Sequence, residues 1–206
     1  QKAVNYERIL IVKPSAIGDV TTALPALHSL RKAFPNARIS WLIRKEFAGL
    51  LTNHPELDDI IEFDRRLLGR WWRDKAAFRE MKNLVKRLKD GDFDIVFDFQ
   101  GLFRSGLLSW LTGSKIRFGM SEARELSPLF YTRKVKPPQN SLHTIDYYQK
   151  MVSEAGVEDV DVEFVLPARH QAADKCRRLL ADSGVDADDF RIFVVSASDP
   201  NKCWQS

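Results

Sequence analysis

Short apolar runs alternate with longer amphipathic stretches along most of the chain. The apolar runs have the length and composition of buried strands, which predicts strands over 8–13, 38–43, 59–63, 94–99 and 115–119. Between and after them, apolar residues recur at helical spacing, which predicts helices over about 19–34, 46–53, 73–89, 102–112 and 143–155. Because strands that alternate with helices form parallel sheets, the pattern predicts an α/β fold with helices on both faces of one parallel sheet.

The pattern changes near Pro167, which breaks the chain after the apolar run "VEFVL" (162–166), a further predicted strand. From Ala168 a new helix is expected, with Gly184 as its C-cap, and the apolar run 190–198 follows as a strand. A buried parallel strand needs neighbours on both sides, and only eight residues remain after this one. We therefore expect one domain over 1–167 and the truncated start of a second α/β domain over 168–206.

Composition fits a folded protein in a reducing compartment. The chain has 206 residues, 44% of them hydrophobic, and 32 basic against 28 acidic side chains, so only the placement of its charge can indicate a partner. Its two cysteines, Cys176 and Cys203, lie in unlike contexts, which disfavours a disulfide framework. The apolar run near Gln1 is shorter than the roughly 20 residues of a spanning helix and no signal cleavage pattern follows. These features predict a cytoplasmic protein. Gln1 is an unusual start, so residues are expected before it.

The turn "KPSAIGD" follows the first predicted strand, and ligands of open α/β sheets bind beyond the carboxyl ends of strands. Gly18 would let the backbone approach a ligand closely. It is the only glycine of the turn, whereas a dinucleotide fingerprint needs three, which disfavours an NAD-type oxidoreductase. Asp19 is either an acid that favours the helix start or a general base, and the pattern leaves both interpretations open.

Two further strand ends carry polar side chains. In "FDFQGLFRSG", Asp98, Gln100 and Arg104 could bind a sugar or phosphate, or could form an ordinary loop and helix cap. In "FGMSEARELSPLFYTRK", Arg124 lies in an irregular segment and gains interest only where an anionic ligand is expected.

A run of arginines surrounds two tryptophans between the third and fourth predicted strands. Interleaved cations and aromatic rings suit phosphate groups, a membrane interface or nucleic acid, and equally a solvated loop. No nucleic-acid motif accompanies the run, so nucleic acid is not expected as a partner. The four histidines lack partners at metal-ligand spacing, which predicts no structural metal. The arginines are Arg65, Arg66, Arg70 and Arg73.

Taken together, several stretches resemble glycosyltransferase family 9, the ADP-heptose:lipopolysaccharide heptosyltransferases. They are the strand, "GD" turn and helix over 9–43, the "D-x-Q-G-L" strand end, the "A-R-E" loop and "SASDPNKCW". The first and third are most similar to heptosyltransferases that act on the Kdo–lipid A inner core. The resemblance covers nearly the whole chain and implies a two-domain GT-B fold of Rossmann-like halves, with the second domain truncated here. Such a partial chain is expected to be inactive alone.

The resemblance also implies roles for individual residues. Asp19 would be the catalytic base of an inverting transfer, and the arginines named above, with Arg124, would face the lipopolysaccharide acceptor. We assign Gln100 and Arg104 to the same acceptor because of their position after a buried strand. Ser198, Lys202 and Gly18 would serve the ADP-heptose donor. Contact with the cytoplasmic face of the inner membrane follows from such an acceptor. The alternative is a non-catalytic Rossmann-like module that binds an anionic glycolipid.

Overall fold

The computed structural model describes residues 5–69, 72–139, 143–167, 170–186 and 189. Its internal contacts divide the chain into two units, 1–167 and 168–206, which are described separately. Arg70, Ser198, Lys202 and the strand predicted over 190–198 lie outside the described residues.

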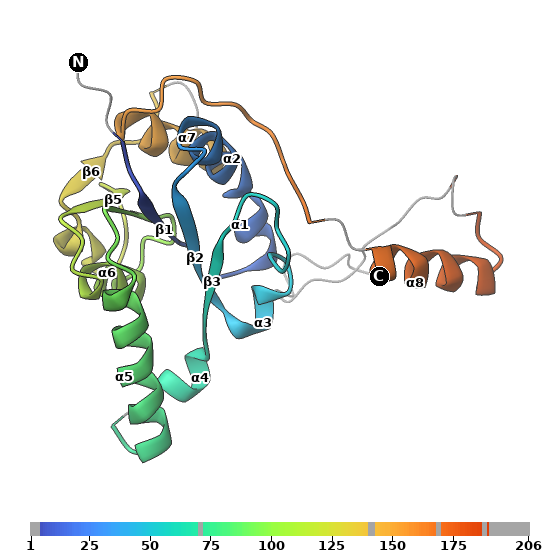
Figure 1. Ribbon diagram of the computed structural model, residues 1–206, viewed down its shortest axis with the longest axis horizontal. Coiled ribbons are helices and arrows are strands. Elements are labelled where there is room, and N and C mark those ends of the chain that lie inside the picture. Colours follow the sequence, from blue (N-terminus) through green and yellow to red (C-terminus); the bar gives the residue numbers. More distant parts are fainter. Residues whose placement is uncertain (1–4, 70–71, 140–142, 168–169, 187–188, 190–206) are drawn as a thin grey trace, which may run out of the picture. The chain divides into compact units, whose positions relative to one another are not determined.

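The first unit is built on a six-stranded sheet in which every pairing is parallel (Figure 1). The strand order is β3-β2-β1-β4-β5-β6, and this confirms the predicted parallel α/β sheet. The three-residue edge strand β6 was not predicted, because its run is short and mostly charged. The strands are β1 (Arg8–Val12), β2 (Arg38–Arg44), β3 (Asp59–Phe63), β4 (Ile95–Asp98), β5 (Ile116–Met120) and β6 (Arg133–Val135).

Helices connect the strands, and a 3-10 turn η1 (Ser127–Phe130) precedes β6. The helix predicted over 19–34 is in fact two helices, because Pro25 opens a new first turn, where its missing N–H costs no hydrogen bond. The helix predicted over 46–53 is one turn long, and the short α4 was not predicted. The helices are α1 (Ile17–Thr21), α2 (Leu24–Ala33), α3 (Lys45–Ala48), α4 (Arg65–Leu68), α5 (Lys75–Asp90), α6 (Phe103–Leu111) and α7 (Thr144–Glu154).

Hydrophobic side chains cover both faces of the sheet. In β1, Ile9 and Ile11 join a cluster that includes side chains of α2 and α7, whereas Leu10 and Val12 join a second cluster with α5 and α6. All four are fully buried. Burial on both faces explains why β1 reads as a continuous apolar run.

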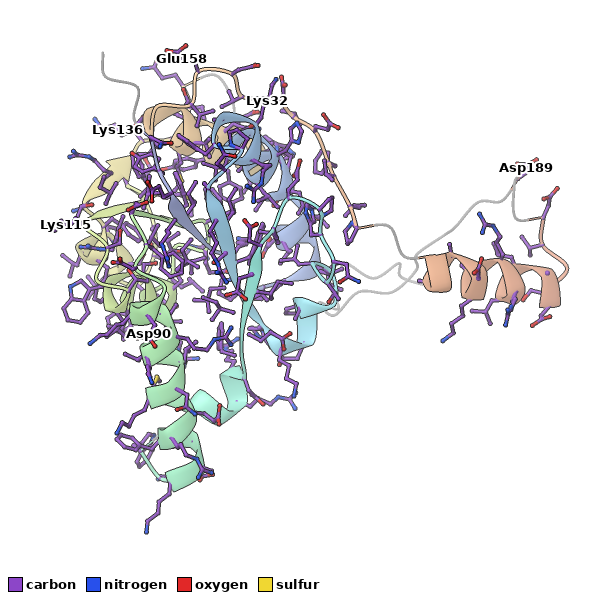
Figure 2. The ribbon with its side chains drawn as sticks, viewed as in Figure 1. Lys32, Asp90, Lys115, Lys136, Glu158 and Asp189 are labelled. Atoms are coloured by element: carbon purple, nitrogen blue, oxygen red, sulfur yellow. The ribbon has the colours of Figure 1, made fainter. Side chains whose placement is uncertain are left out.

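The segment after α7 forms no strand, so the strand predicted over 162–166 is wrong. Its backbone is bonded to side chains instead of a neighbouring strand: the Asp161 N–H donates to Ser29 Oγ, and the Asp161 carbonyl accepts from Gln149 Nε2. Lys32, labelled in Figure 2, holds the same segment through Nζ–Oδ2 distances of 2.6 Å to both Asp159 and Asp161.

In the second unit, α8 (His170–Asp182) is the described element. Gly184 follows it with φ +69°, as expected for a glycine that ends a helix. Within the described ranges of both units, no helix has the length and apolar character needed to cross a bilayer.

Candidate active site

The strand order reverses between β1 and β4, so the connections that leave these two strands diverge to opposite faces of the sheet. Ligands of such sheets bind in the crevice beyond the carboxyl ends at this reversal. The two segments that enter it are the turn from Lys13 to Asp19 and the turn from Asp98 to Gly101.

Asp19 lies in the first turn of α1 and its side chain is exposed. Its Oδ2 accepts a hydrogen bond from the Ala16 N–H at 3.1 Å, so the carboxylate does stabilise the helix start. The same exposure leaves the carboxylate open to a substrate hydroxyl. The two interpretations of Asp19 are therefore compatible. Gly18 beside it faces open space, because a Cβ there would meet nothing within 4 Å.

Lys13, at the end of β1, is buried and was missed by the sequence reasoning. Its Nζ donates to the Phe99 carbonyl at 3.0 Å, and the Tyr148 hydroxyl donates to the same oxygen at 2.8 Å. Burial lowers the pKa of Lys13, while the nearby Asp19 and Asp98 carboxylates act in the opposite direction. Lys13 therefore joins the ends of β1 and β4 and places a cation near Asp19. The sequence feature that could have identified Lys13 is a lysine directly after an apolar strand.

Asp98 holds the second turn in place. Its carboxyl is fully buried, and Oδ1 accepts from the N–H groups of Gln100 at 2.9 Å and Gly101 at 3.2 Å. Oδ2 accepts from the Tyr131 hydroxyl at 2.7 Å. Burial raises the pKa of Asp98, and these hydrogen bonds oppose that rise. Asp98 is thus a structural acid that fixes the turn carrying Gln100.

The turn from Asp98 to Gly101 also holds the "A-R-E" loop in place. Gly101 has φ +69°, and its carbonyl accepts from the Arg124 N–H at 3.0 Å. Glu125 reaches back to the start of α6, where its Oε2 accepts from the Phe103 N–H at 3.3 Å. Gln100 closes the crevice from the other side, since its Oε1 accepts from the Ser15 N–H at 3.4 Å.

A cleft of about 190 Å³ opens beside these turns. Three of the predicted binding residues line it together, although they come from two separate stretches of sequence. Arg65, Gln100 and Arg104 are these residues, and Ser15, Arg44 and Glu125 also line the cleft.

Arg44 is a cleft residue that the sequence reasoning missed. It closes β2, and its guanidinium donates to Glu46 Oε1 at 3.0 Å and lies 5.1 Å from the Phe47 ring centroid. Its Nε is buried without a hydrogen-bond partner among the described residues. A buried donor of this kind favours a ligand acceptor in the cleft. The sequence feature that could have identified Arg44 is its position at the end of a buried strand.

The remaining predicted residues are not gathered in the cleft. The Arg66 N–H donates to Asp64 Oδ1 at 2.7 Å, and the Arg73 guanidinium lies 4.0 Å from the ring centroid of Trp72. Arg124 contacts the turn through its backbone. Whether the side chains of these three arginines bind a ligand stays a prediction.

Within the part of the chain that the structure describes, no three His, Cys, Asp or Glu side chains are grouped as metal ligands. The histidines near the sheet have structural partners. His28 Nδ1 lies 2.6 Å from Glu56 Oε1, and His54 Nε2 lies 2.9 Å from the Val165 carbonyl oxygen.

A doubly wound parallel sheet with a cationic cleft at its strand reversal defines an α/β domain of the Rossmann-like class, in which ligands bind at that reversal. The sequence model of glycosyltransferase family 9 (heptosyltransferase) matches residues 81–206, and the chain belongs to this family.

Individual relatives agree with this assignment. Lipopolysaccharide heptosyltransferase 1 of Escherichia coli strain K12 is 26% identical over 200 residues, which cover 96% of this chain and 60% of that protein. The protein of the same name from Salmonella typhimurium is 35% identical over 130 residues, covering 62% of this chain and 41% of the relative. The structure of the E. coli heptosyltransferase WaaC with ADP-2-deoxy-2-fluoro heptose has a TM-score of 0.74 at 25% identity, covering 96% of this chain and 62% of that one. This chain thus spans about three-fifths of the relatives' length at most.

Proposed function

We propose that this chain forms the acceptor-binding half, and the start of the donor-binding half, of an inverting heptosyltransferase. It would move a heptose from ADP-heptose onto the Kdo–lipid A region of the lipopolysaccharide inner core, at the cytoplasmic face of the inner membrane. The observation that carries the proposal is the cleft in which Arg65, Gln100 and Arg104 meet beside the turn of Asp19, in a chain of family 9.

The proposed reaction has one group on each side of the anomeric carbon. The acceptor hydroxyl oxygen forms a bond to that carbon as its proton passes to the Asp19 carboxylate. On the opposite side, the bond between the anomeric carbon and the diphosphate oxygen breaks, and ADP leaves with the electron pair. Attack from the face opposite the leaving group inverts the configuration. The transition state has the oxocarbenium character known from glycoside hydrolysis.

The donor side of this scheme rests on the family resemblance. Ser198 and Lys202 would stabilise the negative charge that develops on ADP, with Gly18 allowing close approach. The scheme requires no metal or other cofactor.

The proposed binding of the acceptor rests on the positive charge of the cleft. Arg44, Arg65 and Arg104 line the cleft against a single lining carboxylate, that of Glu125, which suits the phosphate and carboxylate groups of an inner-core glycolipid. The backbone turn fixed by Asp98 presents Gln100 as a further hydrogen-bonding group.

The test is transfer from ADP-heptose to Kdo–lipid A by the full-length protein, with the anomeric configuration of the product read by NMR. Arg65→Gln with Arg104→Gln should raise the acceptor KM by about tenfold or more for each charge lost, since hydrogen bonds to charged groups contribute about 1.5–3 kcal/mol. The matched control is Arg38→Gln, an exposed arginine at the amino end of β2. Absence of transfer would leave the glycolipid-binding module as the better description. An unchanged acceptor KM would show that the two arginines do not bind the acceptor.

A further inference from the structure

Two aromatic side chains near the N-terminal end of α5 are exposed and do not belong to either hydrophobic cluster. Trp72 is 62% exposed and Phe78 is 48% exposed. Each ring has a cation beside it: the Arg73 guanidinium lies 4.0 Å from the Trp72 ring centroid, and Lys82 Nζ lies 5.9 Å from that of Phe78. We call Trp72, Arg73, Lys75, Phe78 and Lys82 the α5 tip.

The positive charge of the chain is concentrated in the segment that contains this tip. Residues 64–90 contain ten basic and four acidic side chains, whereas the whole chain contains 32 and 28. The rest of the chain therefore carries a small acidic excess. The tip combines local positive charge with exposed aromatic rings, which is the composition of surfaces that bind anionic membranes.

The tip has a defined structure at the N-terminal end of α5, which lies away from the sheet (Figure 1). Asp74 caps α5, with Oδ1 accepting from the Ala76 N–H at 2.8 Å. The helix has 16 residues, about 24 Å at the usual rise. Figure 1 shows α5 extending away from the sheet, and Asp90, labelled in Figure 2, marks the end nearer the sheet.

A groove between α5 and α6 adjoins the cleft. The groove has a volume of about 310 Å³, and its lining includes Met81 of α5 and Leu107 and Leu111 of α6. Arg65 and Arg104 line both the groove and the cleft. A membrane that receives the tip would therefore lie on the side from which a membrane-embedded acceptor reaches the cleft.

We propose that the α5 tip docks the protein onto an anionic phospholipid bilayer, with the Trp72 and Phe78 rings at headgroup level and Lys75 and Lys82 against anionic headgroups. The proposal goes beyond the proposed function, because it requires neither a glycolipid acceptor nor a nucleotide sugar.

The experiment is co-sedimentation of the full-length protein with vesicles that contain no lipopolysaccharide. Mixed phosphatidylethanolamine–phosphatidylglycerol vesicles should bind the protein, and pure phosphatidylcholine vesicles should bind it more weakly. Lys75→Gln with Lys82→Gln should weaken binding about fivefold for each charge, in a salt-dependent manner. Trp72→Ala with Phe78→Ala should weaken it about tenfold or more.

Matched controls remove the same groups elsewhere. Trp110→Ala removes a tryptophan on α6 that is 53% exposed. Lys115→Gln with Lys136→Gln removes two exposed lysines that Figure 2 labels away from α5. Both controls should bind like the wild type. All substituted side chains are exposed, and circular dichroism with thermal unfolding checks that each variant is folded.

Three results would overturn the proposal: no binding of the wild type to the anionic vesicles at low ionic strength, tip variants that bind as well as the wild type, or controls that lose as much as the tip variants. Binding only after lipopolysaccharide is added would assign the tip to the acceptor instead. Transfer to a soluble, deacylated acceptor is measured in parallel. Normal transfer with no vesicle binding would sink the docking proposal alone, and vesicle binding without transfer would sink the proposed function alone.

Discussion

At the scale of single residues, the structure makes the two alternative interpretations of Asp19 compatible with each other. Its carboxylate accepts a backbone hydrogen bond at the start of α1 and is also exposed at the crevice. Stabilising the helix start uses one oxygen of the carboxylate, so the group can still accept a proton from a substrate. An asparagine at this position separates the two tasks, since its amide oxygen keeps the helix contact but is no base.

Asp19→Asn in the full-length protein should therefore lower turnover by about 10²–10⁴-fold, the usual contribution of a general base, while the free energy of unfolding changes by about 0.5 kcal/mol or less. Steady-state transfer from ADP-heptose and urea unfolding measure the two quantities. Asp146→Asn is the control, because Asp146 is also an acid in the first turn of a helix, α7. Near-normal turnover of Asp19→Asn would remove Asp19 as the base.

Asp98 gives a prediction on pH. Burial raises the pKa of its carboxyl, so the folded protein binds this proton more tightly than the unfolded chain does. The contribution of Asp98 to stability is therefore fully present below the unfolded pKa, about 4, and is lost as the pH rises through the folded pKa. Asp98→Asn should abolish this decline in urea unfolding measured from pH 4 upward.

Tyr131→Phe should raise the pKa of the Asp98 carboxyl further, whereas Asp98→Asn removes the titrating group. The Tyr131 hydroxyl donates to Asp98 Oδ2, and this hydrogen bond lowers the pKa of Asp98. Its removal should extend the decline of stability to higher pH. An identical pH profile in both variants and the wild type would show that Asp98 does not titrate in this range.

At the scale of elements, the apolar periodicity predicted the five longer strands and the alternation with helices, because strands buried on both faces must be continuously apolar. It could not predict β6 or α4, which are short and held mainly by neighbours. It also failed for 162–166: the preceding residue, Asp161, is bonded through its backbone to side chains of α2 and α7, and the Val165 carbonyl oxygen lies 2.9 Å from His54 Nε2. Local pattern carries no information about such distant partners.

The turn after β4 is the element that joins two of the motifs. Gly101 has φ +69°, and a Cβ there would lie 2.7 Å from Met120 Cε and 3.2 Å from the Ala123 Cβ. Gly113 has φ +80°, and a Cβ there would meet nothing within 4 Å. Gly101→Ala and Gly113→Ala therefore share the backbone strain, and only the first adds a steric clash next to the "A-R-E" loop.

Both alanine variants should lose about 1–2 kcal/mol of stability from the left-handed conformation. Gly101→Ala should lose more than Gly113→Ala, and it alone should raise the acceptor KM, because Arg124 and Glu125 depend on the turn. Thermal unfolding and transfer kinetics on the full-length protein give the comparison. Equal losses in both variants would mean that the side chains of Met120 and Ala123 move aside at little cost.

At the scale of the whole molecule, the family motifs identified three cleft residues but not their neighbours. Arg65, Gln100 and Arg104 come from recognisable stretches, whereas Arg44 and Lys13 follow apolar strands that carry no motif. Only the strand order brings Arg44 into the cleft with these three and joins Lys13 to the end of β4, and strand order is a property of the folded sheet. The polar ends of β1, β2 and β4 were visible in the sequence, but their adjacency was not.

The division of the chain at Pro167 can be tested with a fragment. Every described side chain of the two hydrophobic clusters belongs to residues before 168, so a fragment of residues 1–167 keeps the whole core that the structure describes. We expect this fragment to unfold cooperatively on heating and to bind Kdo–lipid A in calorimetry. It should not bind ADP-heptose, because Ser198 and Lys202, the residues proposed to hold the diphosphate, are absent from it, and Gly18 only allows close approach. A fragment that unfolds without a cooperative transition would show that the second domain supports the first. Binding of ADP-heptose by the fragment would move the donor site into the first unit and contradict the roles proposed for the two halves.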